Sequence, residues 1–162
     1  NLSFSADYEA EFDQLFDARV PATDPTVYVC AASVTDPTHA PAGHESWFVL
    51  VNAPEGGGEM AGYGDHLLEV MAARGWDLSG RVVHREQISP ADIESRFRTP
   101  GGAIYGTSSN GRAAAFLRPG NRGPLDGLYL CGGSSHPGGG LPLVAMSGAI
   151  AAGLCAEDLA RR

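Results

Sequence analysis

The sequence predicts an α+β fold in which an antiparallel or mixed sheet is combined with several helices. Two apolar segments rich in β-branched and aromatic residues, 26–32 and 46–52, are typical of strands. The connection between them is too short for a crossover helix, so they should be antiparallel neighbours. Two stretches with helical periodicity, 5–19 and 59–74, predict helices. A chain of 162 residues is long enough for one domain with a real core.

The first elements are a short strand and a helix. Residues 1–4 predict the end of a strand, and Ser5 is a suitable cap for a helix that reaches about Arg19. Apolar side chains recur at helical spacing on one face of this helix, whereas acidic side chains lie on the opposite, solvated face. The apolar set is Tyr8, Phe12, Leu15 and Phe16, and the acidic set is Glu9, Asp13 and Asp17.

Two histidines lie in the polar connection between the two long strands. This connection, residues 33–45, contains His39 and His44 together with two prolines. Two histidines on a loop could bind a metal, but no cysteine or third histidine lies near them in the sequence. We therefore interpret residues 33–45 as a solvated loop.

The middle of the chain predicts a linker, two helices and one further strand. Residues 54–58 have the composition of a flexible linker, and residues 59–74 form an amphipathic helical pattern that Gly75 closes. Residues 81–87 have strand character. Ser89, followed by Pro90 and Asp92, predicts the capped start of a short helix.

The last third of the chain contains an apolar segment, a glycine-rich bend and a small-residue helix. Residues 128–131 follow the turn pair Asp126-Gly127, which indicates a buried strand. Five of the next nine residues are glycine, and from Leu141 the composition predicts a helix that tolerates Pro142 in its first turn. Such a helix directs free N–H groups at the bend, which suits an anion or an electron-rich carbonyl. A tight turn whose glycines only permit close packing explains the same pattern.

The order of residues in this region carries more information than its composition. Gly127-Leu-Tyr-Leu-Cys-Gly-Gly-Ser-Ser-His-Pro-Gly-Gly-Gly-Leu-Pro142, with Arg118-Pro-Gly-Asn-Arg122 and Ser147-Gly148, closely resembles the carboxy-terminal flavin motif of phytoene desaturases (phytoene dehydrogenases). These proteins are bacterial-type, FAD-dependent carotenoid desaturases. The resemblance continues through Gly102-Ala-Ile-Tyr-Gly106 and Pro25-Thr-Val-Tyr-Val29, so it covers nearly the whole chain. The Rossmann-type glycine motif that opens those proteins has no match here, which together with Asn1 as the first residue suggests a carboxy-terminal portion.

The resemblance implies a division of the chain and a set of site residues. Residues 1–100 would belong to the substrate domain, and residues 101–162 would contain a flavin-proximal loop and the last strand and helix of a Rossmann-type FAD-binding domain. FAD is the implied cofactor, approached by Gly132 and Gly133 at its phosphate or ribityl part. The pyrimidine edge of the flavin would face Gly140, Leu141, Pro142 and Leu143.

Two further residues are candidates for a role, Tyr105 from the same resemblance and His136 from its chemistry, although a histidine on a loop often serves only as a hydrogen-bonding group. Tyr105 would lie near the flavin and the tunnel that admits the lipid substrate. His136 is a candidate catalytic acid or base, because histidine titrates near neutrality. The implied reaction is desaturation of a lipophilic polyene precursor such as phytoene, by a cytoplasmic parent protein peripheral to a membrane and completed by the missing amino-terminal portion.

Two other interpretations remain open at this point. Another member of the flavin amine-oxidase superfamily would usually place an acidic residue directly after the glycine at position 133. Its absence, and the Ser135-His-Pro137 sequence, favour desaturases. Alternatively, the isolated chain is a structural or interaction module without activity.

Composition excludes some function classes. The formal net charge of −8 argues against nonspecific nucleic-acid binding. Residues 1–77 carry a net charge of −11 and residues 78–162 one of +3, so the basic half contains the glycine-rich bend. The same asymmetry is expected if the acidic half is simply the solvated one.

The cysteines and the longest apolar run complete the sequence-based predictions. Cys30, Cys131 and Cys155 lie in apolar runs without metal-ligand spacing, which predicts buried thiols in a reducing compartment. The run 141–156 is interrupted by Ser147 and two glycines, so we do not expect a transmembrane helix.

Overall fold

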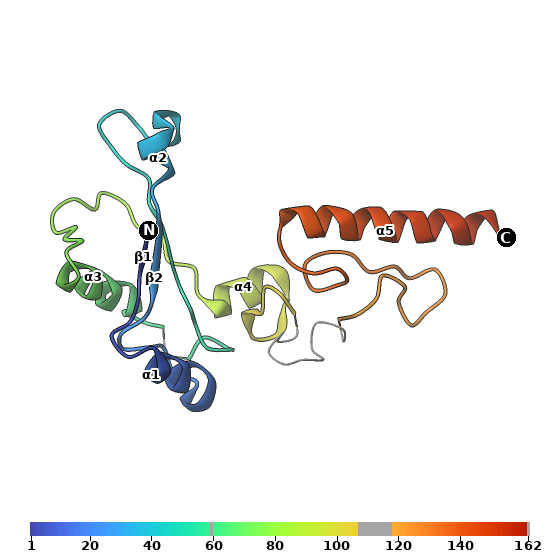
Figure 1. The fold of residues 1–162 in the computed structure, drawn as a ribbon, viewed down its shortest axis with the longest axis horizontal. Coiled ribbons are helices and arrows are strands. Elements are labelled where there is room, and N and C mark those ends of the chain that lie inside the picture. The colour runs from blue at the N-terminus through green and yellow to red at the C-terminus, as the bar shows by residue number, and fades with distance from the viewer. Residues whose placement is uncertain (59, 107–117, 162) are drawn as a thin grey trace. The chain divides into compact units, whose positions relative to one another are not determined.

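The computed structural model describes residues 1–58, 60–106 and 118–161. The chain divides into two compact units, which are described separately below (Figure 1). Unit 1 consists of Asn1–Arg96 and Pro100–Gly102, and unit 2 of Phe97–Thr99 and Ala103–Arg162.

Unit 1 is built on a three-stranded antiparallel sheet in the order β1-β2-β3. The strands are β1 (Leu2–Ser3), β2 (Val27–Cys30) and β3 (Phe48–Val51). In the register of β2 and β3, Val27 pairs with Val51 and Cys30 with Phe48. The prediction that segments 26–32 and 46–52 are adjacent antiparallel strands is confirmed.

One face of this sheet packs against helix α3 (Tyr63–Ala73) and forms the core. The period of two along β2 buries Val27 and Val29, and Met71 of α3 completes the buried cluster. Partly buried side chains packed against this cluster are Val49, Val51, Leu67, Trp76 and Leu78.

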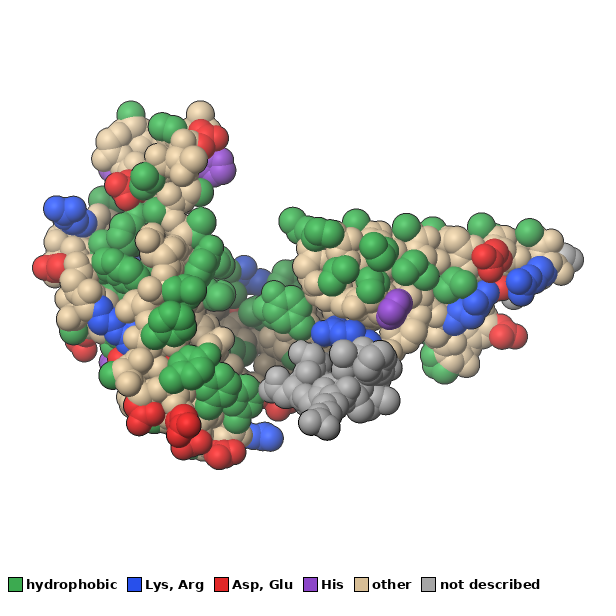
Figure 2. All heavy atoms as spheres, viewed as in Figure 1, with side chains coloured by type: hydrophobic (Ala, Val, Ile, Leu, Met, Phe, Trp, Pro, Cys, Tyr) green, Lys and Arg blue, Asp and Glu red, His purple; other side chains and the backbone are tan. Residues whose placement is uncertain are grey.

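The opposite face of the sheet is apolar but exposed. Leu2 pairs with Tyr28, and Tyr28 pairs with Leu50, so these three side chains lie on the same face. Phe48, two residues before Leu50, extends the same surface. All four are exposed, and hydrophobic side chains accordingly gather on the surface of unit 1 in Figure 2. We refer to these four residues as the open sheet face.

The first helix differs from the prediction in its cap. Helix α1 (Tyr8–Phe12) continues into the π-helical segment η1 (Asp13–Ala18), and Arg19 ends it in a left-handed conformation. Its N-cap is Asp7, whose carboxylate accepts a hydrogen bond from the Ala10 N–H at 3.0 Å. The predicted Ser5 cap is therefore wrong, and the Ser5 N–H instead donates to Thr26 Oγ1.

The aromatic side chains of this helix form an exposed row. Phe4, Tyr8, Phe12 and Phe16 follow one another with ring centroids 6.3, 4.9 and 5.5 Å apart. Of the apolar face that the sequence predicts, only Leu15 is buried. We refer to these four rings as the aromatic row.

The connection between β2 and β3 contains short helical turns rather than only a loop. These are α2 (Ala32–Thr35) and η2 (Pro37–His39). His39 and His44 are both exposed. In the part of the chain that the structure describes, no group of His, Cys, Asp or Glu is arranged to hold a metal.

The segment 54–58 is packed, so its interpretation as a flexible linker is wrong. The Gly56 N–H donates to the Gly101 carbonyl at 3.0 Å, and Pro54 and Gly57 are buried. A Cβ at Gly57 would lie 3.4 Å from the Pro90 ring. These contacts fix the segment against Gly101 and against Pro90, the first residue of a later helix.

The elements after this segment agree with the prediction in part. Helix α3 begins at Tyr63, after left-handed Gly62, later than the predicted start at residue 59, which lies outside the described residues. The predicted strand 81–87 is wrong, because its side chains bind the start of α3 instead: Gln87 Oε1 accepts from the Gly64 N–H at 3.1 Å. Helix α4 (Pro90–Phe97) begins as predicted, since the Ser89 hydroxyl donates to Asp92 at 2.6 Å. It is followed by η3 (Pro100–Gly102).

Unit 2 is dominated by helix α5 (Leu141–Ala160), which begins where the sequence predicts. The predicted strand 128–131 is present as one antiparallel bridge between Arg122 and Tyr129, and its place in a larger Rossmann-type sheet stays a prediction. By length and composition alone, α5 could cross a membrane, with a mean hydropathy of 1.5. It buries only Ser147 and Ala151.

The cysteines are less buried than the sequence predicts. Cys131 is exposed, and Cys30 and Cys155 are half-buried. The prediction of three buried thiols is wrong for Cys131 and only partly met by the other two cysteines.

Candidate functional site

The glycine-rich loop 132–140 and the first turn of α5 form the candidate site. Gly132, Gly138 and Gly140 have φ values of +121°, +137° and +100°, a region that side chains rarely adopt. At Gly132 and Gly140, an added Cβ would meet no atom of the described residues within 4 Å. The loop therefore leaves open space beside its backbone at two of the predicted cofactor-binding glycines.

The start of α5 is open to solvent. Gly140 occupies the N-cap position, and no side chain of the described residues caps the helix. Leu141 is 88% exposed, and Pro142 and Leu143 are exposed as well. Because Pro142 has no N–H, the first turn offers the amides of Leu141 and Leu143 and the positive end of the helix dipole to whatever binds there.

Tyr105 lies against the glycine-rich loop. A Cβ at Gly139 would collide with the Tyr105 ring, so only glycine permits this packing. A Cβ at Gly133 would lie 3.5 Å from the Gly139 Cα and 3.8 Å from a Val144 methyl group. The structure thus brings Tyr105, Gly133 and the first turns of α5 together, and Gly139 is a contact that the sequence alone did not single out.

A buried polar pair holds the loop to α5. Asn121 is 5% exposed and Ser147 is fully buried. Asn121 Nδ2 lies 3.0 Å from the carbonyl oxygens of Leu130 and His136 and from Ser147 Oγ. Ser147 Oγ in turn accepts a hydrogen bond from the Gly132 N–H at 3.2 Å.

Arg118 binds the loop from a second point. Its Nη1 donates to the Gly133 carbonyl at 2.8 Å and to the Tyr105 carbonyl at 3.1 Å. Arg118, Asn121 and Ser147 all lie in stretches that carry the sequence resemblance. Nothing in the sequence shows which backbone groups they bind, so their roles were missed.

His136 is placed by its backbone. Its N–H donates to the Pro119 carbonyl at 2.9 Å and its carbonyl accepts from Asn121. The side chain is exposed and has no hydrogen-bond partner in the described residues. Its role as an acid or base stays a prediction.

The far end of α5 carries a separate set of charges. Arg122 binds the Asp158 carboxylate through two nitrogens at 2.8 and 3.2 Å, and the Tyr129 hydroxyl donates to it at 2.8 Å. The Arg122 and Tyr129 hydrogen bonds hold the pKa of Asp158 below its usual range. A pocket of about 360 Å³ lies beside these residues and Arg161, away from the predicted site residues.

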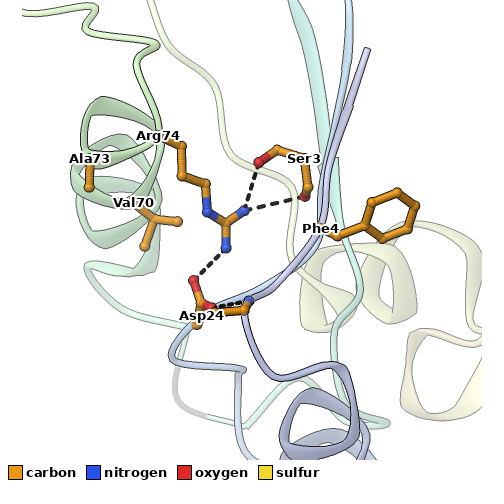
Figure 3. Close-up of a pocket in the computed structure, with 7 residues that line it drawn as sticks. Ser3, Phe4, Asp24, Val70, Ala73 and Arg74 are labelled. Atoms are coloured by element: carbon orange, nitrogen blue, oxygen red, sulfur yellow. Dashed lines mark hydrogen bonds and ion pairs between the residues drawn. The ribbon is translucent and has the colours of Figure 1, made fainter.

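Unit 1 contains a pocket of about 420 Å³ beside Arg74 (Figure 3). Arg74 Nη1 donates to the carbonyls of Ser3 and Pro25 at 3.3 and 2.9 Å, and Nη2 pairs with the Asp24 carboxylate. Hydrogen bonding from the Ala6 N–H, followed by that from Arg74, lowers the pKa of Asp24. The Arg74 contacts join the end of α3 to the segments around Ser3 and Asp24–Pro25, so Arg74 serves the fold rather than a ligand.

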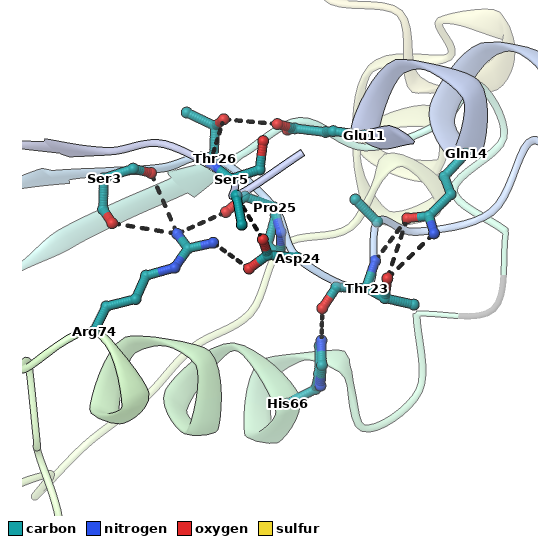
Figure 4. Close-up of polar contacts among 12 residues, drawn as sticks. Ser3, Ser5, Glu11, Gln14, Thr23, Asp24, Pro25, Thr26, His66 and Arg74 are labelled. Carbon is teal, nitrogen blue, oxygen red and sulfur yellow. Dashed lines mark hydrogen bonds and ion pairs between the residues drawn. The ribbon is translucent and has the colours of Figure 1, made fainter. Parts of the chain in front are cut away.

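Polar groups also fix α1 and α3 to the sheet (Figure 4). Glu11 is 1% exposed, and its carboxylate accepts from the Thr26 hydroxyl at 2.6 Å. The Tyr63 hydroxyl donates to the Ala22 carbonyl at 2.7 Å, and burial raises the pKa of Tyr63 to about 12. These groups find their partners inside unit 1 and leave no polar atom for chemistry.

Comparison with known proteins gives relatives along nearly the whole chain, although no family model matches it. It is 36% identical over 161 residues to a 1-hydroxycarotenoid 3,4-desaturase of Flavobacterium sp. (strain P99-3), covering 95% of this chain and 33% of that protein. It is 37% identical over 159 residues to a hydroxyneurosporene desaturase of Rubrivivax gelatinosus, covering 94% and 30%.

A third relative differs in its printed activity. The chain is 32% identical over 156 residues to a 4,4'-diaponeurosporene oxygenase of Staphylococcus haemolyticus (strain JCSC1435), covering 91% of this chain and 31% of that protein. The resemblance to carotenoid desaturases is confirmed. The chain spans about a third of the length of the curated relatives it matches.

Proposed function

We propose that this chain, which is related over nearly its whole length to carotenoid desaturases, is the carboxy-terminal portion of an FAD-dependent oxidoreductase that desaturates a lipophilic polyene. The relatives name hydroxylated carotenoids as substrates, and phytoene is a further candidate of the same chemical class. Unit 1 would contribute to the substrate domain. Unit 2 would supply the last strand and helix of a Rossmann-type FAD-binding domain.

The observation that carries this proposal is the open backbone around the start of α5. Gly132 and Gly140 leave space where other residues would place a Cβ, and the helix beside them has no side-chain cap in the described residues. This arrangement fits a flat, electron-rich ring system that approaches backbone N–H groups closely. Gly132 and Gly133 would hold the phosphate or ribityl part of FAD, and residues 140–143 would face the pyrimidine edge.

In such a site the residues of this chain would position FAD and the substrate and stabilise the negative charge that develops. When bound, FAD supplies the acceptor for the hydride that leaves the substrate as a proton departs from the adjacent carbon. The N–H groups of Leu141 and Leu143 present partial positive charge where negative charge would develop. Tyr105, 57% exposed beside Gly139, offers an aromatic surface to an apolar substrate.

The proposal extends to the setting of the parent protein. A polyene of this kind partitions into lipid, so a cytoplasmic protein peripheral to a membrane is the arrangement we propose. The amino-terminal portion of the same polypeptide would supply the remaining FAD contacts.

The test is to purify the full-length protein that contains this chain and to record its visible absorbance. We expect a flavin band that a hydroxylated or unmodified acyclic carotenoid bleaches under anaerobic conditions. Bleaching by amines instead would favour the amine-oxidase alternative. A protein that neither retains nor rebinds FAD would overturn the proposal and favour a structural module.

An oxygenated product is the second candidate, because several relatives are named oxygenases. Mass spectrometry of the product separates the two reactions. Desaturation removes hydrogen from the polyene, whereas oxygenation adds oxygen to it.

A further inference from the structure

A loop that presents N–H groups to a ligand must bind its own carbonyl oxygens elsewhere. In a trans peptide the C=O and the following N–H point in opposite directions. Arg118 Nη1 holds the Gly133 carbonyl at 2.8 Å, so the Ser134 N–H of the same peptide points away from Arg118. The amides of Ser134, Gly138, Gly139 and Gly140 have no acceptor in the described residues.

Asn121 ties three separate segments together at one point. Its Nδ2 lies 3.0 Å from Leu130 O, His136 O and Ser147 Oγ, which belong to the bridge segment, the loop and α5. Its own backbone carbonyl accepts from the Leu130 N–H at 2.9 Å. An amide nitrogen carries two hydrogens, so both N–H groups of the Asn121 side chain have acceptors.

Ser147 extends the same network to the first glycine of the loop. Its hydroxyl oxygen, fully buried, accepts from the Gly132 N–H at 3.2 Å. This bond fixes the peptide that enters the loop, while Arg118 fixes the peptide between Gly133 and Ser134, two residues later. Polar side chains this deeply buried lower stability unless they are hydrogen-bonded, so packing alone gives no reason for Asn121 and Ser147 here.

We propose that Arg118 and Asn121 are positioning residues that bind the Gly133 and His136 carbonyls and so hold the glycine-rich loop with the amides of Ser134 and residues 138–140 free for a flavin. The inference rests on the proposed function for the identity of the ligand. Arg118, Pro119 and Asn121, which bind backbone groups of the loop, then act as a template for its conformation.

The test uses the full-length protein and measures two quantities. The first is the dissociation constant for FAD, taken on the folded fraction, and the second is amide hydrogen exchange of residues 132–136. Asn121→Asp keeps the size of the side chain but replaces a donor by an acceptor, and Arg118→Met keeps its length without any donor. We expect each to weaken FAD binding at least tenfold, about 1.4 kcal/mol, and to speed exchange in the loop.

The matched control is Arg122→Gln, in the residue next to Asn121. Its side chain forms an exposed ion pair with Asp158, away from the loop. Exposed pairs contribute little, so FAD affinity and loop exchange should both stay at the unmodified values.

Ser147→Ala is a milder second variant, which keeps the test decisive if Asn121→Asp or Arg118→Met fails to fold. It removes the oxygen that accepts from both the Gly132 N–H and Asn121 Nδ2, so exchange at Gly132 should rise and FAD affinity should fall severalfold. A merely structural role would lower the folded fraction and leave the FAD dissociation constant of folded molecules unchanged, which would overturn the inference.

The failure of this inference and of the proposed function can be told apart. If the unmodified protein binds FAD and Asn121→Asp binds it equally well, the positioning role is wrong and the proposed function stands. If the unmodified protein binds no FAD, the proposed function is wrong. Unchanged loop exchange in both variants would then overturn the positioning role as well.

Discussion

Gly140 is the residue at which loop and helix meet, and its conformation decides what a substitution there would do. Its φ of +100° makes a β-branched side chain strained, at a cost of about 1–3 kcal/mol. Its Cβ would meet no described atom within 4 Å, so no clash adds to that strain. In the full-length protein we therefore expect Gly140→Val to stay soluble and to lose bound FAD, measured by visible absorbance after gel filtration.

Gly127→Val is the matched control for this substitution. Gly127 has a φ of +81° and likewise has open space around a Cβ, but it lies in the exposed turn before Leu128. It should carry a similar strain and retain FAD. Equal flavin content in both variants would mean that the glycines of the loop are there for packing alone.

Tyr63 predicts how unit 1 responds to alkali. Burial raises its pKa to about 12, whereas an unfolded tyrosine titrates near 10. The resulting stabilisation is fully present below about pH 10 and is lost as the pH rises towards 12, because the ionised side chain could no longer donate to the Ala22 carbonyl. Urea denaturation of the chain at a series of pH values should show this loss.

Tyr63→Phe is the control for the alkaline effect. Phenylalanine keeps the ring but cannot ionise, so the variant should start less stable and lose less stability between pH 10 and 12. An identical alkaline profile in the variant would assign the effect to other tyrosines. On the acid side, the lowered pKa of Asp24 contributes stability above the usual aspartate range that disappears as the pH falls through its folded value.

At the scale of elements, α5 carries a face of small, exposed residues: Ala145, Ala149, Ala152, Gly153 and Ala156. Gly153 lies in the helix interior with no described atom within 4 Å of an added Cβ. In the 162-residue chain, Gly153→Ala should stabilise the helix by about 0.5–1 kcal/mol, measured by thermal unfolding.

The same substitution should behave differently in the full-length protein. If α5 packs its small face closely against a sheet there, as we propose for a Rossmann-type domain, an added methyl group would be destabilising. Stabilisation of both proteins would contradict that packing and leave this face of α5 solvated.

The elements that the sequence predicts correctly are those whose signals are local. Two β-rich segments with a short connection give antiparallel neighbours, and Ser89 with Asp92 gives the start of α4. The predicted strand 81–87 fails because a strand needs a partner, and this segment has none in the described residues. Local composition cannot supply that partner. Segment 128–131 has a single bridge, from Tyr129 to Arg122, and its place in a larger sheet stays a prediction.

The candidate site was predictable to a similar extent. Positive φ values at Gly132 and Gly140 are expected where glycines form the bend between an extended segment and a helix. The start of α5 at Leu141 follows from the change to apolar composition at that residue. The roles of Arg118, Asn121 and Ser147 depend on contacts 9 to 26 residues apart in the chain. Such contacts are set by tertiary packing and leave no periodic signal.

At the scale of the whole molecule, the amount of exposed apolar surface is the main feature. In unit 1 the open sheet face and the aromatic row are uncovered, and in unit 2 α5 exposes Leu141, Met146 and Leu159 (Figure 2). Soluble monomers rarely expose apolar patches of this kind without a partner. We expect the isolated chain to bind a hydrophobic dye strongly, and the full-length protein to bind it weakly.

The isolated chain should also bind FAD weakly or not at all. The adenosine and pyrophosphate contacts would come mainly from the amino-terminal portion, and each tenfold loss in affinity corresponds to about 1.4 kcal/mol. Fluorescence titration of the 162-residue chain with FAD measures this. Stoichiometric FAD retained through purification of the isolated chain would contradict the division of contacts that we propose.

The contacts of Arg74 also imply an order in which the segments of unit 1 fold. Arg74 bonds to Ser3 across 71 residues and to Asp24 across 50, whereas α5 needs only neighbours four positions away. Helices form within about a microsecond, but distant segments must first close long loops, which slows folding. On a translating ribosome, β1 would therefore wait unpaired until β2 had emerged, and the guanidinium that joins α3 to both segments would arrive only after them.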